Sequence, residues 1–258
     1  MLVLRDVTIT FRRYAGLLRQ VEVPGVRGVS LRLAPGEVLA LVGGSGAGKS
    51  LIAHAILGLL PRNALLRGTL EFDGQVLGQP YPPGLRGRRI AFLPQQASHL
   101  DPTARVGRQL AWAARRVGAR ADLGARLAAL GLSQDTTRLY PHQLSGGMAR
   151  RVLAAAAGAG QPDLLIADEP TVGLDPASAA RLLDRLRAEA ARGAAVLLIS
   201  HDLPAILPLA HRVAVLAEGG MRAEERAADF AGQGDALSSA YARALWRALP
   251  QNGFDPDA

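Results

Sequence analysis

The 258-residue sequence contains no cysteine, few aromatic residues and a single lysine. Without cysteine, the chain has neither a disulfide framework nor a thiolate-ligated metal site. Because aromatic residues make up 4% of the chain and hydrophobic residues 49%, the core must consist mainly of aliphatic side chains. The absence of cysteine also suits a reducing compartment such as the cytosol.

A long apolar segment is also missing. The N-terminal residues reach Arg5 and Asp6 before the apolar region of a signal peptide can form. Later apolar stretches are interrupted by Arg151 or by residues 161–163, well short of the ~18 residues that a membrane span needs. We therefore expect a soluble chain, or one that reaches a membrane only through a partner.

The charge balance is strongly basic, with a formal net charge of +8 and a sequence pI of about 11.0. Such a balance is compatible with binding to nucleic acid or to an anionic membrane surface. However, the arginines are scattered, and only local pairs such as Arg12-Arg13 and Arg115-Arg116 occur. This distribution favours a solvated, arginine-rich surface over a dedicated basic block.

Alternating strand and helix patterns predict an α/β fold with a mainly parallel sheet. Residues 2–11 alternate apolar and polar side chains, as in a half-buried strand. Nearly continuous apolar runs are typical of strands covered on both faces, and they occupy 37–43, 163–168, 195–200 and 211–217. Other strands are expected at 68–74 and 89–94, and helices at 50–60, 145–160, 176–192 and within 236–249.

Two regions depart from this alternation. Between Arg105 and Leu132, alanine, leucine and arginine recur at helical spacing. We therefore expect residues 97–160 to form a helical subdomain that is inserted between two strands of the sheet. After about residue 220 the sequence is polar, and we expect it to be irregular until the last helix.

The stretch GGSGAGKS, residues 43–50, follows a predicted buried strand and opens a helix. It matches the G-x-x-x-x-G-K-[ST] pattern, in which backbone N–H groups and a helix N-terminus surround phosphate oxygens. Lys49 can reach the β- and γ-phosphates as a compact charge, whereas a planar guanidinium does not fit such a nest. The Ser50 hydroxyl can bind Mg²⁺. The predicted ATP-binding residues here are Gly43, Gly44, Ser45, Gly46, Ala47, Gly48, Lys49 and Ser50.

Two carboxylates end the apolar stretch LLIADE, residues 164–169. We predict that Asp168 binds Mg²⁺, directly or through water, and that Glu169 polarises the attacking water as a general base. Taken alone, the stretch could be a strand with a polar end. Its occurrence in one chain with a phosphate-binding loop favours the catalytic interpretation.

The stretch LSGGM, residues 144–148, places a second glycine-rich turn at the start of a predicted helix. Such a turn can hold an anion, although Ser145 could alternatively be an ordinary N-cap residue. Two anion sites in one chain suggest that two copies enclose each nucleotide between them.

These stretches, together with GLD at 173–175 and ISHD at 199–202, resemble in order and spacing the motifs of the ATP-binding cassette (ABC) ATPases. The resemblance covers nearly the whole chain. It implies a P-loop NTPase fold with a RecA-like core, an antiparallel β subdomain and an inserted helical subdomain. It also implies that Ser145, Gly146 and Gly147 bind the nucleotide held by an opposite subunit.

Further roles follow from the same resemblance. Gln95 is similar to the family's glutamine that contacts Mg²⁺ and water and communicates with the membrane subunit. Asp175 resembles the D-loop aspartate at the ATP site. His201 resembles the switch histidine that contacts the γ-phosphate, so the expected catalytic residues are Glu169 and His201. The expected Mg²⁺ ligands are Ser50, Gln95 and Asp168.

One family feature is left open by the sequence. The candidates for the aromatic residue that stacks on adenine are Phe11 and Tyr14. Each of them could equally be a core or a surface residue.

Within the family, the sequence is most similar to the group that serves oligopeptide, dipeptide and nickel importers. Met148 stands where glutamine is commoner in the signature, as is usual in this group. Residues 241–250 resemble the group's C-terminal motif, with Ser239-Ala240 where His-Pro is commoner. We therefore predict a nucleotide-binding domain at 1–232 and a C-terminal extension at 233–258.

The resemblance implies an ATP-hydrolysing subunit of an ABC importer, with ATP and Mg²⁺ as cofactors. The expected partners are a second cassette subunit, homologous or identical, two membrane permeases and, indirectly, an extracytoplasmic substrate-binding protein. The expected location is the cytoplasmic face of the cell membrane. The cargo would be nickel, a metal–metallophore complex or peptides, and the short segment after Gln95 together with the C-terminal residues favours nickel or a metallophore.

The alternative function is a soluble ABC ATPase acting on DNA or the ribosome. Such proteins usually carry coiled-coil insertions, zinc modules or tandem cassettes, whereas this chain has one cassette and no cysteine. We therefore expect no nucleic-acid partner. A P-loop kinase is disfavoured because LSGGM has no role in that class.

Overall fold

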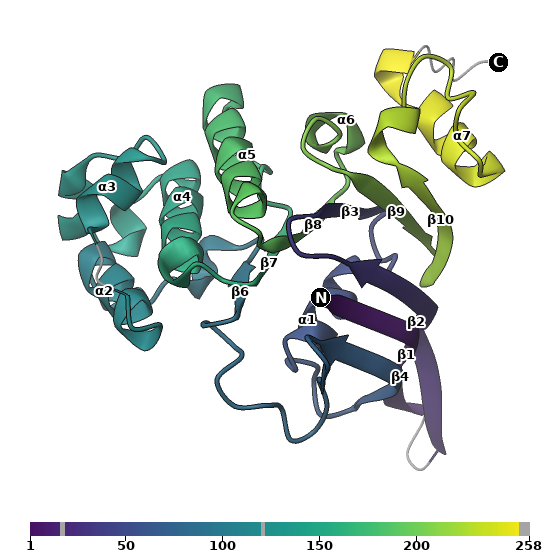
Figure 1. Cartoon of the computed structure of the whole chain (residues 1–258). Coiled ribbons are helices and arrows are strands. Elements are labelled where there is room, and N and C mark those ends of the chain that lie inside the picture. The colour runs from purple at the N-terminus through teal and green to yellow at the C-terminus, as the bar shows by residue number, and fades with distance from the viewer. Residues whose placement is uncertain (16–18, 120–121, 253–258) are drawn as a thin grey trace. The chain divides into compact units, whose positions relative to one another are not determined.

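The computed structural model describes residues 1–15, 19–119 and 122–252 (Figure 1). The chain divides into two compact units. Unit 1 comprises Met1–Leu33, Val38–Tyr81 and the chain from Ser200 onward, and unit 2 comprises Ala34–Glu37 and Pro82–Ile199. Each unit contains parallel strands with helices beside them, which confirms the predicted α/β class.

An antiparallel sheet in the order β2-β1-β4-β5 forms one layer of unit 1. Its central strand β1 pairs with β2 on one side and β4 on the other, with register shifts along both ladders. The apolar residues Leu2, Leu4 and Ile9 of β1 are almost completely buried. The four strands are β1 (Leu2–Ala15), β2 (Arg19–Leu33), β4 (Ala64–Phe72) and β5 (Gln75–Val76).

Unit 1 also holds three strands in the order β10-β9-β3. Strands β3 and β9 are parallel, with Gly43 opposite Leu216, and β10 is antiparallel to β9. β3 is buried along nearly its whole length, as its continuous apolar run predicts. These elements are β3 (Val38–Gly43), α1 (Lys49–Ile56), α6 (Leu203–Ile206), β9 (Arg212–Ala217), β10 (Gly220–Arg226) and α7 (Ala240–Arg247).

Unit 2 is built on three parallel strands in the order β8-β7-β6. Their side chains are almost all buried, whereas α5 buries only one stripe, which includes Leu182 and Leu186. Helices α2, α3 and α4 pack against one another. The elements are β6 (Ile90–Leu93), α2 (Val106–Arg116), α3 (Leu123–Ala128), α4 (Gly146–Ala157), β7 (Leu164–Asp168), α5 (Pro176–Ala191) and β8 (Ala195–Ser200).

Three strands were not expected from the sequence, one of them the two-residue strand β5 (Gln75–Val76). Arg19–Leu33 forms β2, and Gly220–Arg226, expected to be irregular, forms β10. Both lie at sheet edges, where one side of the strand needs no apolar cover. The predicted domain limits at 97–160, 1–232 and 233–258 differ from those of the two units and stay a prediction. Residues 253–258 of the predicted extension lie outside the described residues.

None of the helices formed by the described residues combines the length and the apolar character needed to cross a lipid bilayer.

Candidate nucleotide-binding site

The glycine-rich loop connects the end of β3 at Gly43 to the start of α1 at Lys49. Gly43 (φ +152°) lies so close to β9 that a Cβ atom would overlap the Leu216 carbonyl oxygen. At Gly48 (φ +96°), a Cβ atom would lie 2.8 Å from the Gly25 carbonyl oxygen of β2. Two of the loop's glycines are therefore required by close backbone packing, before any ligand is considered.

Lys49 places its ammonium group inside this loop. Its side chain is only 8% exposed, and Nζ donates hydrogen bonds to the carbonyl oxygens of Gly43 at 2.7 Å and Gly44 at 3.0 Å. An ammonium offers three donors around one small centre, whereas a guanidinium is a wide planar fork. The sole lysine of the chain thus stands where a compact cation is enclosed by loop carbonyls.

The space beside the loop suits a phosphate chain. A cavity of about 190 Å³ is lined by Gly25, Gly46, Ala47, Gly48, Lys49, Ser50 and Leu51. The α1 N-terminus has no side-chain cap and no acidic residue in its first turn. No side chain therefore caps the free N–H groups of this helix end, and no carboxylate offsets its positive dipole. No atom lies within 4 Å of where a Cβ at Gly46 would stand. These features fit the phosphates of ATP.

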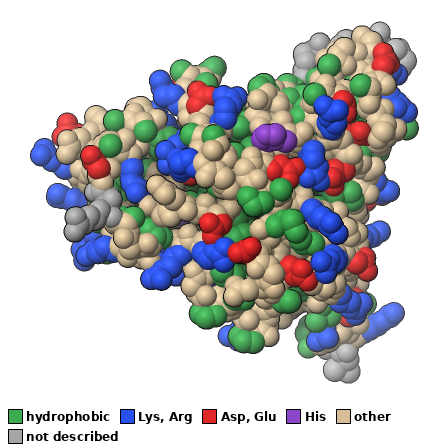
Figure 2. All heavy atoms as spheres, in the orientation of Figure 1, with side chains coloured by type: hydrophobic (Ala, Val, Ile, Leu, Met, Phe, Trp, Pro, Cys, Tyr) green, Lys and Arg blue, Asp and Glu red, His purple; other side chains and the backbone are tan. Residues whose placement is uncertain are grey.

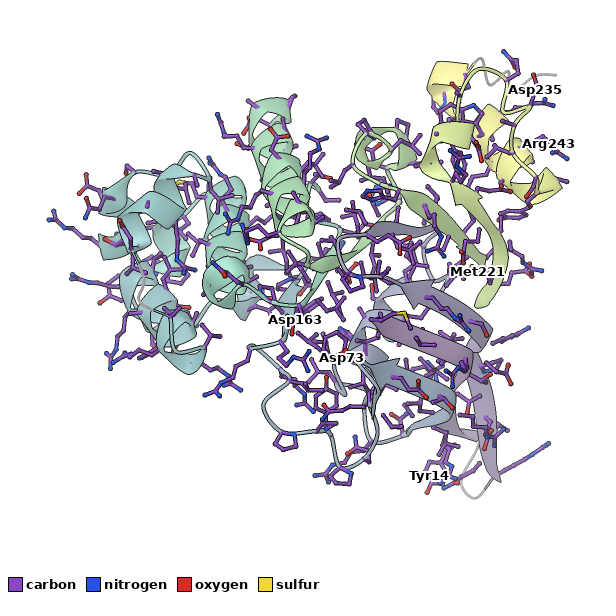
Figure 3. All side chains as sticks on the ribbon, viewed as in Figure 1. Tyr14, Asp73, Asp163, Met221, Asp235 and Arg243 are labelled. Carbon is purple, nitrogen blue, oxygen red and sulfur yellow. The ribbon has the colours of Figure 1, made fainter. Side chains whose placement is uncertain are left out.

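The two aromatic candidates differ in position. The Phe11 ring lies against Gly25, since a Cβ at Gly25 would come 2.9 Å from Phe11 Cε2 and 2.7 Å from Leu51 Cδ1. Gly25 and Leu51 both line the cavity. Tyr14 is 70% exposed near the far end of β1 (Figure 3), where its hydroxyl accepts a hydrogen bond from Gln20 Nε2. The structure therefore brings Phe11, not Tyr14, next to the residues that line the cavity.

In unit 2, the predicted catalytic carboxylates end strand β7. Leu93 of β6 pairs with Ala167 of β7, so Asp168, the last residue of β7, and Gln95, two residues after β6, stand at the carboxyl ends of neighbouring parallel strands. Asp168 and Glu169 are both buried, whereas Gln95 is exposed. Parallel strands commonly present functional residues at their carboxyl ends.

Glu169 adopts a backbone conformation that is rare for its residue type. Its φ is +47°, and its N–H donates to the Ile199 carbonyl oxygen of β8 at 2.9 Å. A left-handed residue other than glycine at a strand end costs free energy, and such residues cluster at functional sites. The turn fixes the backbone at Glu169 where strand β7 stops.

The residues available to a metal ion are oxygen donors. In unit 2 Asp168 offers a carboxylate, and in unit 1 Ser50 offers a hydroxyl; each is the kind of hard oxygen ligand that Mg²⁺ prefers. Among the described residues, no three or more His, Cys, Asp or Glu side chains gather into a complete metal cage. This is compatible with Mg²⁺, which commonly takes one or two protein ligands and completes its shell with phosphate oxygens and water.

The LSGGM turn leads into α4. Ser145 is the N-cap residue, and its hydroxyl accepts a hydrogen bond from the Met148 N–H at 3.2 Å. Ser145 and Gly146 are exposed, and nothing lies within 4 Å of a Cβ built at Gly146. A Cβ at Gly147 would approach Leu174 Cδ2 to 3.3 Å, so this position favours glycine for packing. The turn is thus internally capped and open to solvent.

Asp175 is the N-cap residue of α5. Its carboxylate accepts the Ser178 N–H at 2.9 Å. The pKa of Asp175 is lowered by hydrogen bonds from the Ser178 side chain and backbone and, to a smaller extent, by the Arg151 charge. Asp175 therefore carries its negative charge at neutral pH, at an exposed position next to the GLD turn.

His201 follows the end of β8 and is exposed. The next residue, Asp202, accepts the Ala205 N–H at 3.2 Å and begins α6, while its own N–H donates to Ser200 Oγ at 3.0 Å. This capped turn fixes the backbone on both sides of His201.

The structure thus places the predicted residues in separate sets. Unit 1 holds residues 43–50 and His201, and unit 2 holds Gln95, residues 144–148, the β7 carboxylates and Asp175. The sequence analysis missed Gly25 and Leu51. Gly25 follows Pro24 in a stretch with no strand pattern, so no sequence signal pointed to it.

Comparisons with known proteins agree with this description. A model of the ABC transporter family matches residues 26–172. The oligopeptide transport ATP-binding protein OppD of Mycobacterium tuberculosis is 42% identical over 228 residues, covering 83% of this chain and 36% of the relative. The dipeptide transport ATP-binding protein DppD of Bacillus subtilis is 37% identical over 232 residues, covering 84% of this chain and 68% of the relative.

Solved structures show the same fold. The structure described as an ATP-binding subunit of an ABC transporter superposes with a TM-score of 0.76 at 27% identity, covering 95% of this chain and 98% of that chain. A dimeric ATP-binding cassette bound to ADP and Pi in a post-hydrolysis state superposes with a TM-score of 0.76 at 24% identity, covering 88% and 99%. The predicted P-loop NTPase fold is confirmed.

The chain therefore belongs to the ABC transporter family, as an ATP-binding cassette of the ABC ATPases. It spans about a third of the length of the mycobacterial relative and about two thirds of the Bacillus relatives.

Proposed function

We propose that the chain binds ATP and hydrolyses it, and that this reaction drives an importer for peptides. The observation that carries the proposal is Lys49, whose enclosed ammonium lies beside a cavity at an uncapped helix N-terminus. A buried ammonium needs a negative partner, and a bound phosphate would supply one to Lys49 in addition to the carbonyl oxygens.

The binding roles follow from donor types. Lys49 would turn from its carbonyl partners to the β- and γ-phosphate oxygens, while N–H groups of residues 44–50 hold the remaining oxygens. Phe11 would stack on the adenine. Ser50 and Asp168, with Gln95, would hold Mg²⁺, which when bound neutralises charge on the phosphates.

The catalytic roles fall to two side chains. Glu169 would accept the proton of the attacking water, and its turn at the end of β7 would direct the carboxylate. His201 would donate a hydrogen bond to the γ-phosphate. Both residues would act on the transfer of the γ-phosphoryl group to water, with ADP as the leaving group, so their loss should slow hydrolysis more than binding.

The proposed unit of function is a pair of cassettes. Ser145, Gly146 and Gly147 would contact the γ-phosphate bound by a second cassette subunit, and Asp175 would lie at that contact. The open, exposed turn at Gly146 supports this role, because a partner's anion can approach it without displacing a side chain. The isolated chain should therefore hydrolyse ATP slowly.

We further propose peptides as the cargo, two permeases as membrane partners and the cytoplasmic face of the membrane as the location. The relatives reported above carry oligopeptide and dipeptide names, and none of them supports the earlier expectation of nickel or a metallophore. A soluble role on DNA or the ribosome finds no support among them either.

The ATP proposal is tested by titrating the purified chain with a fluorescent ATP analogue and by measuring phosphate release at high protein concentration. Wild-type protein should bind the analogue and release phosphate with Mg²⁺, whereas Lys49→Ala should do neither. Equal behaviour of the two proteins would overturn the proposal. The cargo is tested in cells lacking this gene: they should lose uptake of a labelled oligopeptide and keep uptake of labelled nickel.

A further inference from the structure

Helix α2 has two contrasting faces. Val106, Leu110 and Ala114 are buried, and the helix packs with them against its neighbours in unit 2. The opposite face carries Arg108, Trp112, Arg115 and Arg116, all of them exposed. Their spacing of four, seven and eight residues from Arg108 puts them on one stripe of the helix.

Trp112 lies in the middle of this stripe. It is 40% exposed, and the Arg108 guanidinium carbon lies 5.0 Å from its ring centroid, within the range of a cation–π contact. Arg88, distant in the sequence, joins the stripe because its Nε donates to the Arg116 carbonyl oxygen at 3.0 Å. We call Arg88, Arg108, Trp112, Arg115 and Arg116 the α2 basic face.

The α2 basic face has little compensating negative charge. The helix VGRQLAWAARR contains no acidic residue, and the ion pairs formed by described residues involve none of these four arginines. The carboxylate influenced by this face is Asp101, whose pKa is lowered mainly by hydrogen bonds from Thr103 and least by Arg108. Figure 2 shows blue Lys and Arg side chains along the edge where α2 and α3 lie.

Helix α7 provides an internal comparison. It also carries an exposed aromatic residue, Tyr241 (43% exposed), and two arginines. However, Arg243 donates to the Leu237 carbonyl oxygen, and Arg247 donates to the Gln233 carbonyl oxygen at 2.9 Å and pairs with Asp235 at 3.3 Å (Figure 3 labels Asp235 and Arg243). The arginines of α7 hold its own surroundings together, whereas Arg108, Arg115 and Arg116 are exposed and take part in no ion pair among the described residues.

We propose that the α2 basic face binds a membrane surface that contains anionic phospholipids. Arginine forms paired hydrogen bonds with phosphate, and tryptophan prefers the headgroup level of a bilayer. Basic residues near an anionic membrane each strengthen binding measurably. Single-stranded nucleic acid is bound in a basic groove where several aromatic side chains stack on successive bases. The α2 basic face has one aromatic ring among arginines on the convex surface of a helix, which suits the flat headgroup layer of a membrane better. The proposal requires neither ATP nor a permease.

The test is sedimentation of the purified full chain with vesicles of phosphatidylcholine, alone or mixed with phosphatidylglycerol. We expect binding to the mixed vesicles, weakening as salt is raised, and no binding to the neutral vesicles. Arg115→Gln/Arg116→Gln should lower the partition coefficient about thirtyfold, at roughly fivefold per basic residue. Trp112→Ala should lower it as well and leave the salt dependence unchanged.

Two matched controls separate this face from overall charge. Arg12→Gln/Arg13→Gln removes the same charge from an adjacent pair on β1, and Tyr241→Ala removes an aromatic residue of similar exposure; both should bind vesicles like wild type. Thermal unfolding of every variant checks that these exposed substitutions leave the fold intact. Equal losses in the two arginine pairs, equal binding to neutral vesicles, or displacement from mixed vesicles by duplex DNA would each overturn the proposal.

Discussion

The chain contains two glycine-rich turns that each open a helix, and they differ in how the helix end is satisfied. The turn before α1 has no capping side chain, and it holds the Lys49 ammonium against its own carbonyl oxygens. The turn before α4 is capped by Ser145, and the cation that reaches it, Arg151, comes from one turn further along the helix, where its Nε donates to the Gly147 carbonyl oxygen at 3.2 Å. The first turn therefore provides both charge and N–H donors for an anion, whereas the second provides an open surface and a hydroxyl.

This difference indicates how the two turns can share one task. A turn with an enclosed cation and open N–H groups can bind a phosphate chain by itself. A turn whose serine already caps its helix has a stable backbone without a ligand. Such a turn can therefore stay folded in the isolated chain and bind an anion only when another subunit presents one. Substitutions at the two turns should accordingly affect binding and assembly to different extents.

The largest effect is expected at the turn before α1. Lys49→Arg should reduce ATP hydrolysis to background, on the order of 10⁴-fold in kcat/KM, because the guanidinium cannot occupy the enclosed position and both binding and transition-state contacts are lost. Nucleotide binding and phosphate release measure the two losses separately. A Lys49→Arg protein with near-normal turnover would disprove the argument from ammonium geometry.

The second prediction concerns Glu169 and the proposed dimer, in which the turn before α1 of one cassette and the turn before α4 of its partner bind the same ATP. Glu169→Gln keeps the shape of the side chain and removes its basicity, so hydrolysis should fall about 10²–10⁴-fold while ATP still binds. The variant should then accumulate as an ATP-bound dimer in size-exclusion chromatography with Mg²⁺. Asp168 or Asp175 would become the candidate base if Glu169→Gln hydrolysed ATP at the parent rate.

The third prediction concerns the adenine end of the first turn. Phe11→Ala should weaken ATP binding by about 1–3 kcal/mol, the value of one base–aromatic stack, because Phe11 lies against residues that line the cavity. Tyr14→Ala serves as the control and should leave the affinity unchanged. The measurement is a titration with ATP and with inorganic triphosphate. Equal losses for the two ligands would show that Phe11 supports the loop and does not contact the base.

The sequence predicted the buried parallel strands and the glycine-rich turns well, because continuous apolar runs and glycine spacing are local signals. It failed at β2 and β10. In β2, Pro24 and exposed polar residues mask the pattern, which an edge strand tolerates because its outer side is unpaired. In β10, the buried positions are occupied by Ala223 and Glu225. Because glutamate is rarely a core residue, the sequence showed no apolar alternation there.

The choice between Phe11 and Tyr14 shows a second limit of sequence reasoning. Phe11 ends the first predicted strand and Tyr14 lies three residues beyond it. Only the pairing of β1 with β2 brings Gly25 and the cavity beside one of them. A contact between residues 11 and 25 depends on strand register, which a linear pattern does not fix. Gly25 was missed for the same reason, although its carbonyl oxygen lies so close to Gly48 that a Cβ atom there would come within 2.8 Å of it.

The smallest effect is expected at the second turn, where two substitutions of Ser145 separate its two roles. Ser145→Ala removes the hydrogen bond accepted from Met148 N–H, so chemical denaturation should show a loss of about 1 kcal/mol. Ser145→Asp keeps a good N-cap acceptor and should retain the stability of the wild type. Its negative charge, however, would face the γ-phosphate bound by the partner cassette, so turnover should fall about fivefold, or about 1 kcal/mol of barrier. If Ser145→Asp retained both stability and turnover, Ser145 would be a capping residue alone, and the second turn would not be an anion site.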